Sequence, residues 1–379
     1  MSPGPDFTAL LTDWRHQLHA KPELSRNERH TAAFICEKLA AWGIEFTAGI
    51  GGHGVVATLS RGASNRSVGL RGDMDALPIE ETTGLAYAST ASGVMHACGH
   101  DGHTTSLLGA AWLLQQDPGW TGTVHLIFQP AEEGAGGAQA MLDDGLLQRF
   151  PIERIFAYHN WPGLGAGQIA VLDGAVMASA SRLDITIEGV AGHAGTPHLA
   201  RDPLLAACHC VSALQSVVAR SIDPLDSGVV SICVLESGRA ANQIAQRAVL
   251  RGTFRAHRPA VRDAMQAAIE RVATGSAAAF GTSALVEIRH GTPPLVNPHE
   301  EAEFARQTLS RLGLETKQNL APSMVSEDFG AYLQHVPGAF LWIGNGDSAG
   351  LHSPDYDFND AILPIAARGL ASLARAALD

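Results

Sequence analysis

The sequence predicts an α/β protein in which a mostly parallel central sheet, flanked by helices, is interrupted by a smaller α+β domain. Short apolar runs alternate with segments of helical periodicity through both ends of the chain, as in a sheet covered by helices. Polar side chains directly follow several of these runs, and strand ends are where an open α/β sheet carries its sites. Between the two ends, residues 181–291 change to the order strand-helix-strand-strand-helix-strand.

The composition is that of a globular protein with a large core. The 379 residues are 46% hydrophobic, and this length suggests about two or three domains. The net charge of −12 and the lack of a basic block argue against nucleic acid or an anionic membrane as a partner. No apolar run reaches the ~18 residues of a membrane-spanning helix. The first residues lack the basic and apolar segments of a signal peptide, so we expect a cytoplasmic protein.

The cysteines do not predict disulfides, because their number is odd and none forms a Cys-x-x-Cys pair. Cys98 stands apart from the others because its neighbours are glycine and histidines. The remaining cysteines lie in apolar runs and are expected to be small core residues. They are Cys36, Cys208, Cys210 and Cys233.

The N-terminal part of the chain leads into a pair of aspartates. Its periodic segments are the expected helices 6–20 and 27–42 and the expected strands 54–59 and 67–70. His16 and His19 are expected at the surface or at the edge of the core, since a lone histidine is rarely a ligand. The last strand runs into Asp73 and Asp75, which form either a site at a strand end or a polar turn.

Residues 95–103, Met-His-Ala-Cys-Gly-His-Asp-Gly-His, are the most informative stretch of the chain. Their metal-capable side chains are Cys98, His100, Asp101 and His103. After an expected helix at 104–115 and a strand at 124–128, Glu132 and Glu133 open a glycine-rich loop. Thiolate, imidazole and carboxylate donors together suit zinc and its first-row neighbours. A spare glutamate beside a metal-bound water is what hydrolysis needs, so the pattern predicts a metal-dependent hydrolase.

Two further segments deliver ligand-type side chains. An expected strand at 152–158 ends on His159, and His352 lies in a loop flanked by proline and glycine, where a structural imidazole has little to pack against. Ligand-type groups from several segment ends form a convergent pattern that core histidines would not explain. The remaining elements expected are helices at 136–144, 300–312 and 360–379, a strand at 339–343, and an N-cap with acidic first-turn residues at 326–329.

Residues 181–291 are expected to be a domain inserted into a larger one that consists of residues 1–180 and 292–379. The inserted elements are strands at 183–190, 228–235, 248–256 and 284–289 and helices at 203–221 and 260–280. His193 follows the first of these strands, and on its own it would be interpreted as a turn residue.

These motifs together resemble the aminoacylase and carboxypeptidase metallopeptidases of peptidase family M20. The most similar branch is the amidohydrolase branch, with hippurate hydrolases, bacterial aminoacylases and plant auxin-conjugate hydrolases. The resemblance rests on residues 95–103, on Gln-Pro-Ala-Glu-Glu-Gly at 129–134, on Gly-His-Ala-Gly-Thr-Pro-His at 192–198 and on Leu-His-Ser-Pro-Asp-Tyr-Asp-Phe at 351–358. It implies a zinc-exopeptidase-like domain with a ferredoxin-like lid and dimerisation domain, and therefore a homodimer or higher homo-oligomer.

The resemblance also implies a site for two divalent metal ions. The ligands would be Cys98 as the bridge, with His100, Glu133, His159 and His352. Glu132 would be the general base, and Asp75 would orient a ligating imidazole. Neighbouring side chains of an extended backbone point in opposite directions, so only one of Glu132 and Glu133 is expected to ligate. Asp73 stands where the wider family has a histidine, as it does in the amidohydrolase branch.

The inserted domain would contribute to substrate binding. By resemblance, His193 would bind the scissile carbonyl across a dimer interface. Asn242 and Arg255 would hold the substrate carboxylate, which suits the bidentate geometry of arginine. Where the family has Asn-Val-Ile-Pro, this chain has Asn-Gln-Ile-Ala at 242–245, so the loop that carries Asn242 lacks the proline.

The expected reaction is hydrolysis of the amide bond of an N-acyl amino acid of the hippurate or N-acetyl type, with Glu132 activating a metal-bridged water. Zinc or manganese is expected, with cobalt and nickel as further candidates. A dinuclear dipeptidase or aminopeptidase is the alternative within the class. A catalytically silent metal- or ligand-binding protein is the alternative outside it. Glu132 beside Glu133 argues against the silent protein, because a pure binding site has no use for a base.

Overall fold

The computed structural model describes residues 5–379, which divide into two compact units. Unit 1 comprises Met1–Gly174, Val296–Ala321 and Asp328–Asp379, and unit 2 comprises Ala175–Leu295 and Pro322–Glu327. Unit 2 thus includes Pro322–Glu327, which we expected to belong to the larger domain. The assignment of the two units as a catalytic domain and a lid or dimerisation domain stays a prediction.

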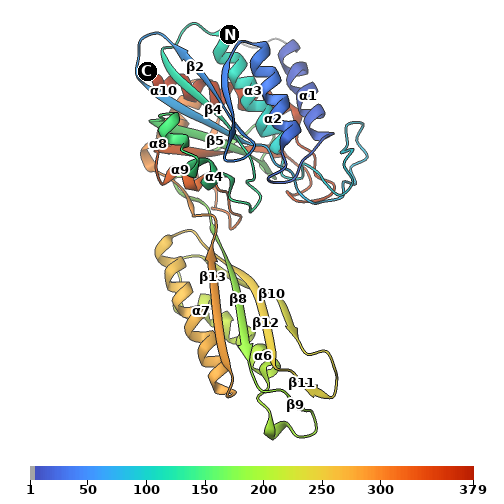
Figure 1. The fold of residues 1–379 in the computed structure, drawn as a ribbon. Coiled ribbons are helices and arrows are strands. Elements are labelled where there is room, and N and C mark those ends of the chain that lie inside the picture. Colours follow the sequence, from blue (N-terminus) through green and yellow to red (C-terminus); the bar gives the residue numbers. More distant parts are fainter. Residues whose placement is uncertain (1–4) are drawn as a thin grey trace. The chain divides into compact units, whose positions relative to one another are not determined.

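Unit 1 is built on an 8-stranded sheet of order β1-β2-β4-β3-β5-β16-β6-β15 (Figure 1). The central strands β4, β3, β5 and β16 run parallel, whereas β2 and β6 join them antiparallel. The strands are β1 (Glu45–Ile50), β2 (Gly54–Arg61), β3 (Ser67–Asp73), β4 (Gly122–Gln129), β5 (Arg154–Pro162), β6 (Ile169–Ala170), β15 (Thr316–Lys317) and β16 (Gly338–Gly346). The predicted α/β class with a mostly parallel centre is confirmed.

The long helices of unit 1 share one apolar core with one face of this sheet. Alternate side chains of β5 enter that core, and the Tyr158 hydroxyl donates to Ser106 Oγ at 2.8 Å. On the opposite face Phe340 of β16 lies against Phe329, with ring centroids 5.3 Å apart. The helices are α1 (Pro5–His19), α2 (Arg29–Ala41), α3 (His100–Gln116), α8 (His299–Ser310) and α10 (Leu363–Leu378), with the shorter α4 (Gly137–Asp143), α5 (Leu146–Arg149) and α9 (Gly330–Leu333).

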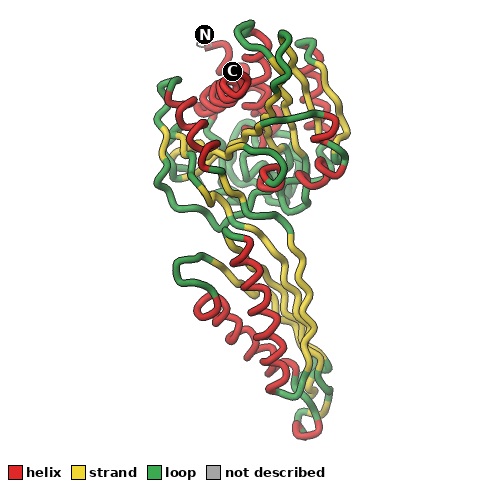
Figure 2. Tube along the Cα trace, turned by 90° about the vertical axis from the view of Figure 1, so that its left-hand side faces the viewer, coloured by secondary structure: helices red, strands yellow, loops and turns green. Residues whose placement is uncertain are grey.

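Unit 2 has the predicted order β8-α6-β10-β12-α7-β13, and its sheet order β10-β12-β8-β13 is that of a ferredoxin-like fold. Every pairing in this sheet is antiparallel. Both helices pack on one face of it through a separate apolar core (Figure 2). Asp202 caps α6 by accepting from the amide of Leu204 at 2.9 Å. The elements are β8 (Ser179–Glu188), α6 (Pro203–Ser221), β10 (Gly228–Ser237), β12 (Arg247–Ala256), α7 (Pro259–Ala279) and β13 (Ser283–His290).

Several local predictions were wrong. Helix α3 begins at His100 rather than at residue 104, so His100 and His103 lie in its first turn. Cys208 and Cys233 are exposed rather than in the core, because they lie on the outward faces of α6 and β10. His19 is fully buried instead of at an edge. Asp328 precedes α9 and is buried rather than in its first turn.

Two helical segments, Pro203–Ser221 and Asp360–Leu378, are long and apolar enough to cross a membrane, contrary to the sequence-based expectation. Asp360–Leu378 is 61% buried, as expected of a core helix. Helix α6 turns Cys210, Leu214 and Val217 into the core of unit 2. Packing within unit 1 therefore explains the apolar character of Asp360–Leu378, whereas Pro203–Ser221 is 28% buried and only its inward face is covered by unit 2. A cytoplasmic location stays a prediction.

Candidate metal centre

The turn before α3 brings the motif side chains to the sheet. Gly99 has a left-handed backbone with φ 85°, and a Cβ there would lie 2.4 Å from Asn160 Oδ1. This position therefore requires glycine. The turn places Cys98 before the helix and His100 at its first residue, and both side chains are buried.

Asp75, just beyond the end of β3, holds several parts of the site together. Its Oδ1 lies 3.2 Å from His100 Nδ1 and accepts from the amide of Glu132 at 3.1 Å. Its Oδ2 accepts from the amide of Glu133 at 3.0 Å and from the Ser25 hydroxyl at 2.6 Å. Burial alone would raise the pKa of Asp75, but the contacts with His100, Ser25 and the Glu133 amide lower it. One ionised carboxylate thus fixes both an imidazole and the glutamate loop.

Asp73 and His103 form a second, closed pair. Asp73 Oδ1 lies 2.5 Å from His103 Nδ1, and Asp73 Oδ2 accepts from Arg71 at 2.6 Å. The other ring nitrogen of His103 lies 2.7 Å from Asn160 Oδ1. Because both of its ring nitrogens have protein partners, His103 supports the site from behind rather than offering a lone pair to an ion.

Glu132 and Glu133 lie on a loop that is not extended. Ala131 has φ 57°, and its amide donates to Glu28 Oε1 at 2.8 Å. Ligand atoms of Glu132, Glu133 and His100 all lie within 4.8 Å of one another. The expectation that the two glutamates point apart was therefore wrong, because the chain turns at Glu133, where the amide of Gly134 donates to the carbonyl of Glu132 at 2.6 Å.

His159 and His352 approach from two other segments. The ring nitrogen His159 Nδ1 lies 2.7 Å from the carbonyl oxygen of Asn160, to which it donates. The other nitrogen, Nε2, is then the lone-pair side and lies 3.4 Å from Cys98 Sγ. His352 has φ 63°, and its amide donates to the carbonyl of Ala97 at 2.8 Å. This backbone tie sets its Nε2 3.3 Å from Glu133 Oε1.

These side chains form overlapping groups with ligand atoms close enough to hold cations. Cys98 belongs both to a group with His100 and His159 and to a group with Glu133 and His352. This shared position is what a bridging thiolate requires. The five expected ligands are therefore brought together.

Two observations test whether a metal ion fits this place. His100 Nε2 and Glu133 Oε1 are buried and have no hydrogen-bond partner among residues 5–379. Such groups are rare in folded proteins unless water or an ion completes them. Burial, followed by the nearby charges of Glu133 and Glu132, raises the pKa of the Cys98 thiol well above its usual value. A thiolate would therefore need a cation here, and the donor set fits a borderline-soft divalent metal.

The electrostatics of the imidazoles agree with this fit. Burial tends to lower the pKa of His100, but Asp73, Asp75 and Glu133 outweigh it and raise the pKa to about 10. Carboxylates that hold a proton at this position would also stabilise a metal cation in its place. Burial and the neighbouring His103 lower the pKa of His159 well below its usual value, which keeps it neutral as a ligand must be.

Asp101, which the sequence counted among the metal-capable residues, faces away into another buried network. Its Oδ2 lies 2.8 Å from His19 Nδ1 and 3.6 Å from an Arg15 nitrogen. Arg15 also contacts Asp357 and Asp360 at 3.1 and 2.6 Å. Asp101 therefore anchors the first turn of α3 to α1 and to the segment before α10.

A buried network that the sequence did not reveal lies behind Glu132. Asp328 Oδ1 accepts from Arg71 at 2.9 Å and from Gln129 at 2.8 Å. The amide of Asp328 donates to Glu132 Oε1 at 3.3 Å. The only sequence signal for these residues was their position in or beside the expected strand at 67–70, the motif at 129–134 and the expected N-cap at 326–329.

The three substrate-binding candidates lie in unit 2, but not in one place. The short strands β9 (Gly192–His193) and β11 (Gln243–Ile244) pair, and the amide of Ala194 donates to the carbonyl of Asn242 at 3.0 Å. His193 and Asn242 are therefore neighbours, and both are exposed. Arg255 lies at the far end of β12, eight residues beyond Arg247, or roughly 26 Å at the rise of a β-strand. There it donates to the carbonyl of Met324 at 2.9 Å.

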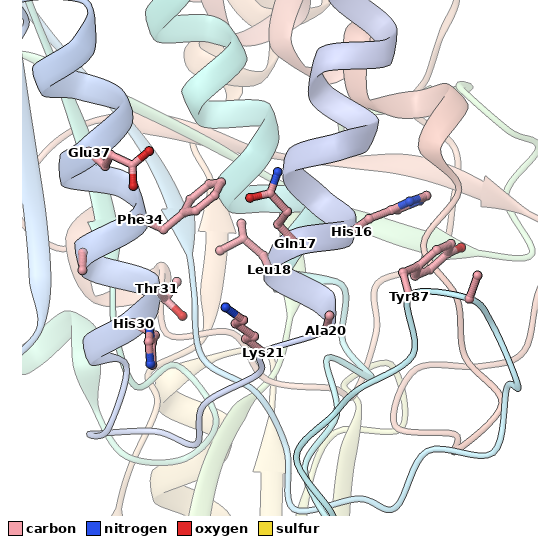
Figure 3. A pocket seen from close by; sticks show the side chains of 12 residues that line it. His16, Gln17, Leu18, Ala20, Lys21, His30, Thr31, Phe34, Glu37 and Tyr87 are labelled. Carbon is pink, nitrogen blue, oxygen red and sulfur yellow. The ribbon is translucent and has the colours of Figure 1, made fainter.

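A surface groove of about 560 Å³ lies elsewhere on unit 1, between α1 and α2 (Figure 3). Its walls combine Lys21, His30 and Glu37 with the apolar Phe34 and the ring of Tyr87. None of the residues that form the groups with close ligand atoms lines this groove. The groove therefore does not mark the candidate metal centre. Converging ligand atoms that lack hydrogen bonds within residues 5–379 identify that centre instead.

Comparisons with known proteins agree with this centre. Peptidase family M20/M25/M40 matches residues 69–376. A hippurate hydrolase of Campylobacter jejuni is 40% identical over 95% of this chain and 94% of its own. An N-acetylcysteine deacetylase of Bacillus subtilis is 38% identical over 97% of each chain. The crystal structure of a Bacillus subtilis dinuclear metal-binding peptidase of the M20 family superposes with a TM-score of 0.88, at 35% identity over 99% of each chain.

The fold and the site therefore define a hydrolase of the metallopeptidase class with an α/β fold. The chain belongs to peptidase family M20/M25/M40, as its motifs predicted.

Proposed function

We propose that this protein hydrolyses the amide bond of N-acyl amino acids, giving a carboxylic acid and a free amino acid. The observation that carries the proposal is the convergence of Cys98, His100 and Glu133, two of whose buried ligand atoms make no hydrogen bond among residues 5–379. The relatives named hippurate hydrolase and N-acetylcysteine deacetylase, each covered over nearly its whole length, support this substrate class.

Two divalent ions would be held by the five ligand-type residues, with Cys98 between them because it alone belongs to both groups. The ligands would be Cys98, His100, Glu133, His159 and His352. When bound, such ions polarise a carbonyl and make a water acidic enough to attack near neutral pH. We propose zinc or manganese, because this mixed donor set accepts both and availability decides between them.

Glu132 would then move the proton. Its Oε1 accepts a hydrogen bond from the amide of Asp328, and its own backbone amide donates to Asp75, so both its carboxylate and its backbone are held. In the proposed reaction Glu132 takes one proton from the attacking water and delivers it to the leaving nitrogen as the carbon–nitrogen bond breaks. Glu132 thus returns to its ionised form at the end of each turnover.

The binding residues of unit 2 favour a homodimer. His193 would donate to the developing oxyanion, and Asn242 and Arg255 would hold the substrate carboxylate. One small substrate cannot span roughly 26 Å of β12, so a single copy of unit 2 cannot present all three residues to it. We propose that one subunit supplies Arg255 and a partner subunit supplies His193 and Asn242.

A substrate panel tests the proposal. Purified protein with measured metal content is offered N-acetyl, N-benzoyl and indole-acyl amino acids beside unblocked dipeptides, and release of the free amino acid is followed. Turnover of the N-acyl compounds is expected. Turnover confined to the dipeptides would replace the proposal with the dipeptidase alternative, and no turnover with both ions bound would support a silent binding protein.

A further inference from the structure

A pair of indole rings lies beside the proposed metal centre and has no part in the proposed chemistry. Trp161 follows His159 by two residues on β5, so both side chains leave the same face of the sheet. Their ring centroids are 6.2 Å apart, with ring planes at 82°. On the neighbouring strand Trp342 pairs in register with His159, and its ring stacks on Trp161 at 4.0 Å and 8°.

The two rings have different environments. Trp342 is 2% exposed, whereas Trp161 is only half-buried. Trp342 Nε1 has no hydrogen-bond partner in the part of the chain that the structure describes, so ring contact rather than a hydrogen bond fixes the pair. Gly344 stands opposite Trp161 on β16 and adds no side chain that could cover it. Trp342 is thus a support, and Trp161 presents indole surface at the end of a strand.

We infer that Trp161 is a specificity-determining residue that binds the acyl group of the substrate, and that this group is aromatic. The inference rests on the proposed amidohydrolase function. We assign Trp161 to the acyl group rather than to the amino acid for the following reason. The substrate carboxylate is proposed to bind Asn242 and Arg255 of unit 2, whereas Trp161 lies next to His159, a proposed metal ligand of unit 1. A pair that served only to fill the core would bury both rings, which is not observed.

An indole held by a second indole is well suited to an aromatic acyl group. Trp161 cannot rotate without losing its stack on Trp342, so little side-chain entropy is lost on binding. Ring-to-ring contact favours a benzoyl or indole-acyl group over acetyl, which has no π-face and little area to bury. The expected preference is roughly tenfold in kcat/KM from the ring contact.

The test compares two substrate pairs. N-benzoylalanine and N-acetylalanine differ only in the acyl group, and N-acetylphenylalanine and N-acetylalanine differ only in the amino acid. We expect the wild type to prefer the benzoyl compound. Trp161→Leu should remove most of that preference and leave the second ratio unchanged, and Trp161→Phe should keep much of it. Trp112→Leu is the matched control, because Trp112 is also half-buried on unit 1 and packs on Phe7 at 5.1 Å.

A binding readout separates recognition from turnover. N-benzoylalanine titrated calorimetrically into Glu132→Gln protein should bind at least several-fold more weakly when Trp161→Leu is added. Trp161→Met, whose longer and more flexible side chain fills irregular space, replaces Trp161→Leu if thermal unfolding shows that the leucine variant does not fold.

The other possible results of these assays contradict either the inference or the proposed function on which it rests. An unchanged acyl ratio in a folded, active Trp161→Leu protein overturns the inference, as does a wild type that does not prefer the benzoyl compound. If Trp161→Leu changes only the ratio between N-acetylphenylalanine and N-acetylalanine, Trp161 contacts the amino-acid side chain instead, and the inference is overturned. If the wild type with bound metal turns over no N-acyl amino acid, the proposed function itself fails, and this inference fails with it.

Discussion

Replacing Asp75 by asparagine tests whether this carboxylate organises the metal centre. Asp75 touches four groups of the site, at 2.6 Å from Ser25, 3.2 Å from His100, 3.1 Å from the Glu132 amide and 3.0 Å from the Glu133 amide. Asparagine has the same shape, but it has one acceptor oxygen and turns an NH2 group toward donors. At least one amide or the imidazole must then lose its partner, and the charge that favours a cation is removed.

Loss of a carboxylate behind a ligating imidazole typically costs 10–100-fold in metal affinity, or about 1.4–2.7 kcal/mol. Because Asp75 also holds the glutamate loop, we expect the upper end of that range. The assay is titration of the chelated protein with zinc and manganese against a competing chelator. The matched control is Glu301→Gln, another buried carboxylate of unit 1, which pairs with Arg154 at 3.2 Å near the start of β5. Equal metal affinity in Asp75→Asn, Glu301→Gln and wild type would refute the organising role.

Three further predictions follow from the same geometry. Cys98→Ala should lower the bound metal from two ions per subunit to one or none, measured by elemental analysis, and a full complement of two would end its bridging role. Mixing inactive Glu132→Gln with inactive His193→Ala subunits should restore activity, and no recovery in demonstrated hybrids would place His193 in its own subunit's site or outside the reaction. Burial lowers the pKa of His125 to about 4. As the pH falls below about 6.5, His125 therefore binds a proton in the unfolded protein before it does so in the folded protein. The free energy of unfolding consequently decreases toward acid pH. His125→Gln should remove about 2 kcal/mol of the loss in unfolding free energy between pH 7.5 and 5, and denaturant curves with an unchanged difference would contradict this.

Most of the metal centre could be predicted because its chemistry is local in sequence. Cys98 and His100 are two residues apart in a glycine-containing stretch, Glu133 follows the end of β4 by four residues, and His159 lies in the C-terminal half of β5. Parallel strands bring their carboxyl ends to one edge, so residues at several strand ends meet there. The order of strands and helices in unit 2 could be predicted for a similar reason, since each element has its own periodicity.

What the sequence could not predict depends on contacts between distant residues. Nothing near His19 indicates that Asp101, 82 positions away, will bury it. Arg71 meets Asp328 across 257 positions, and this pairing converts an apparent helix cap into a buried support for Glu132. The left-handed conformation of Ala131 has no signal in its residue type, and neither has the turn at Glu133, where the ligand atoms of two neighbouring glutamates come within 4.8 Å of each other.

The most direct test of the account is stepwise reconstitution of the metal-free protein while the hydrolysis of an N-acyl amino acid is measured. We predict no activity without metal, a maximum at two ions per subunit, and a Glu132→Gln protein that binds both ions but loses at least 10²-fold in kcat. Full activity in protein shown by elemental analysis to be metal-free, or wild-type kcat in Glu132→Gln, would contradict it.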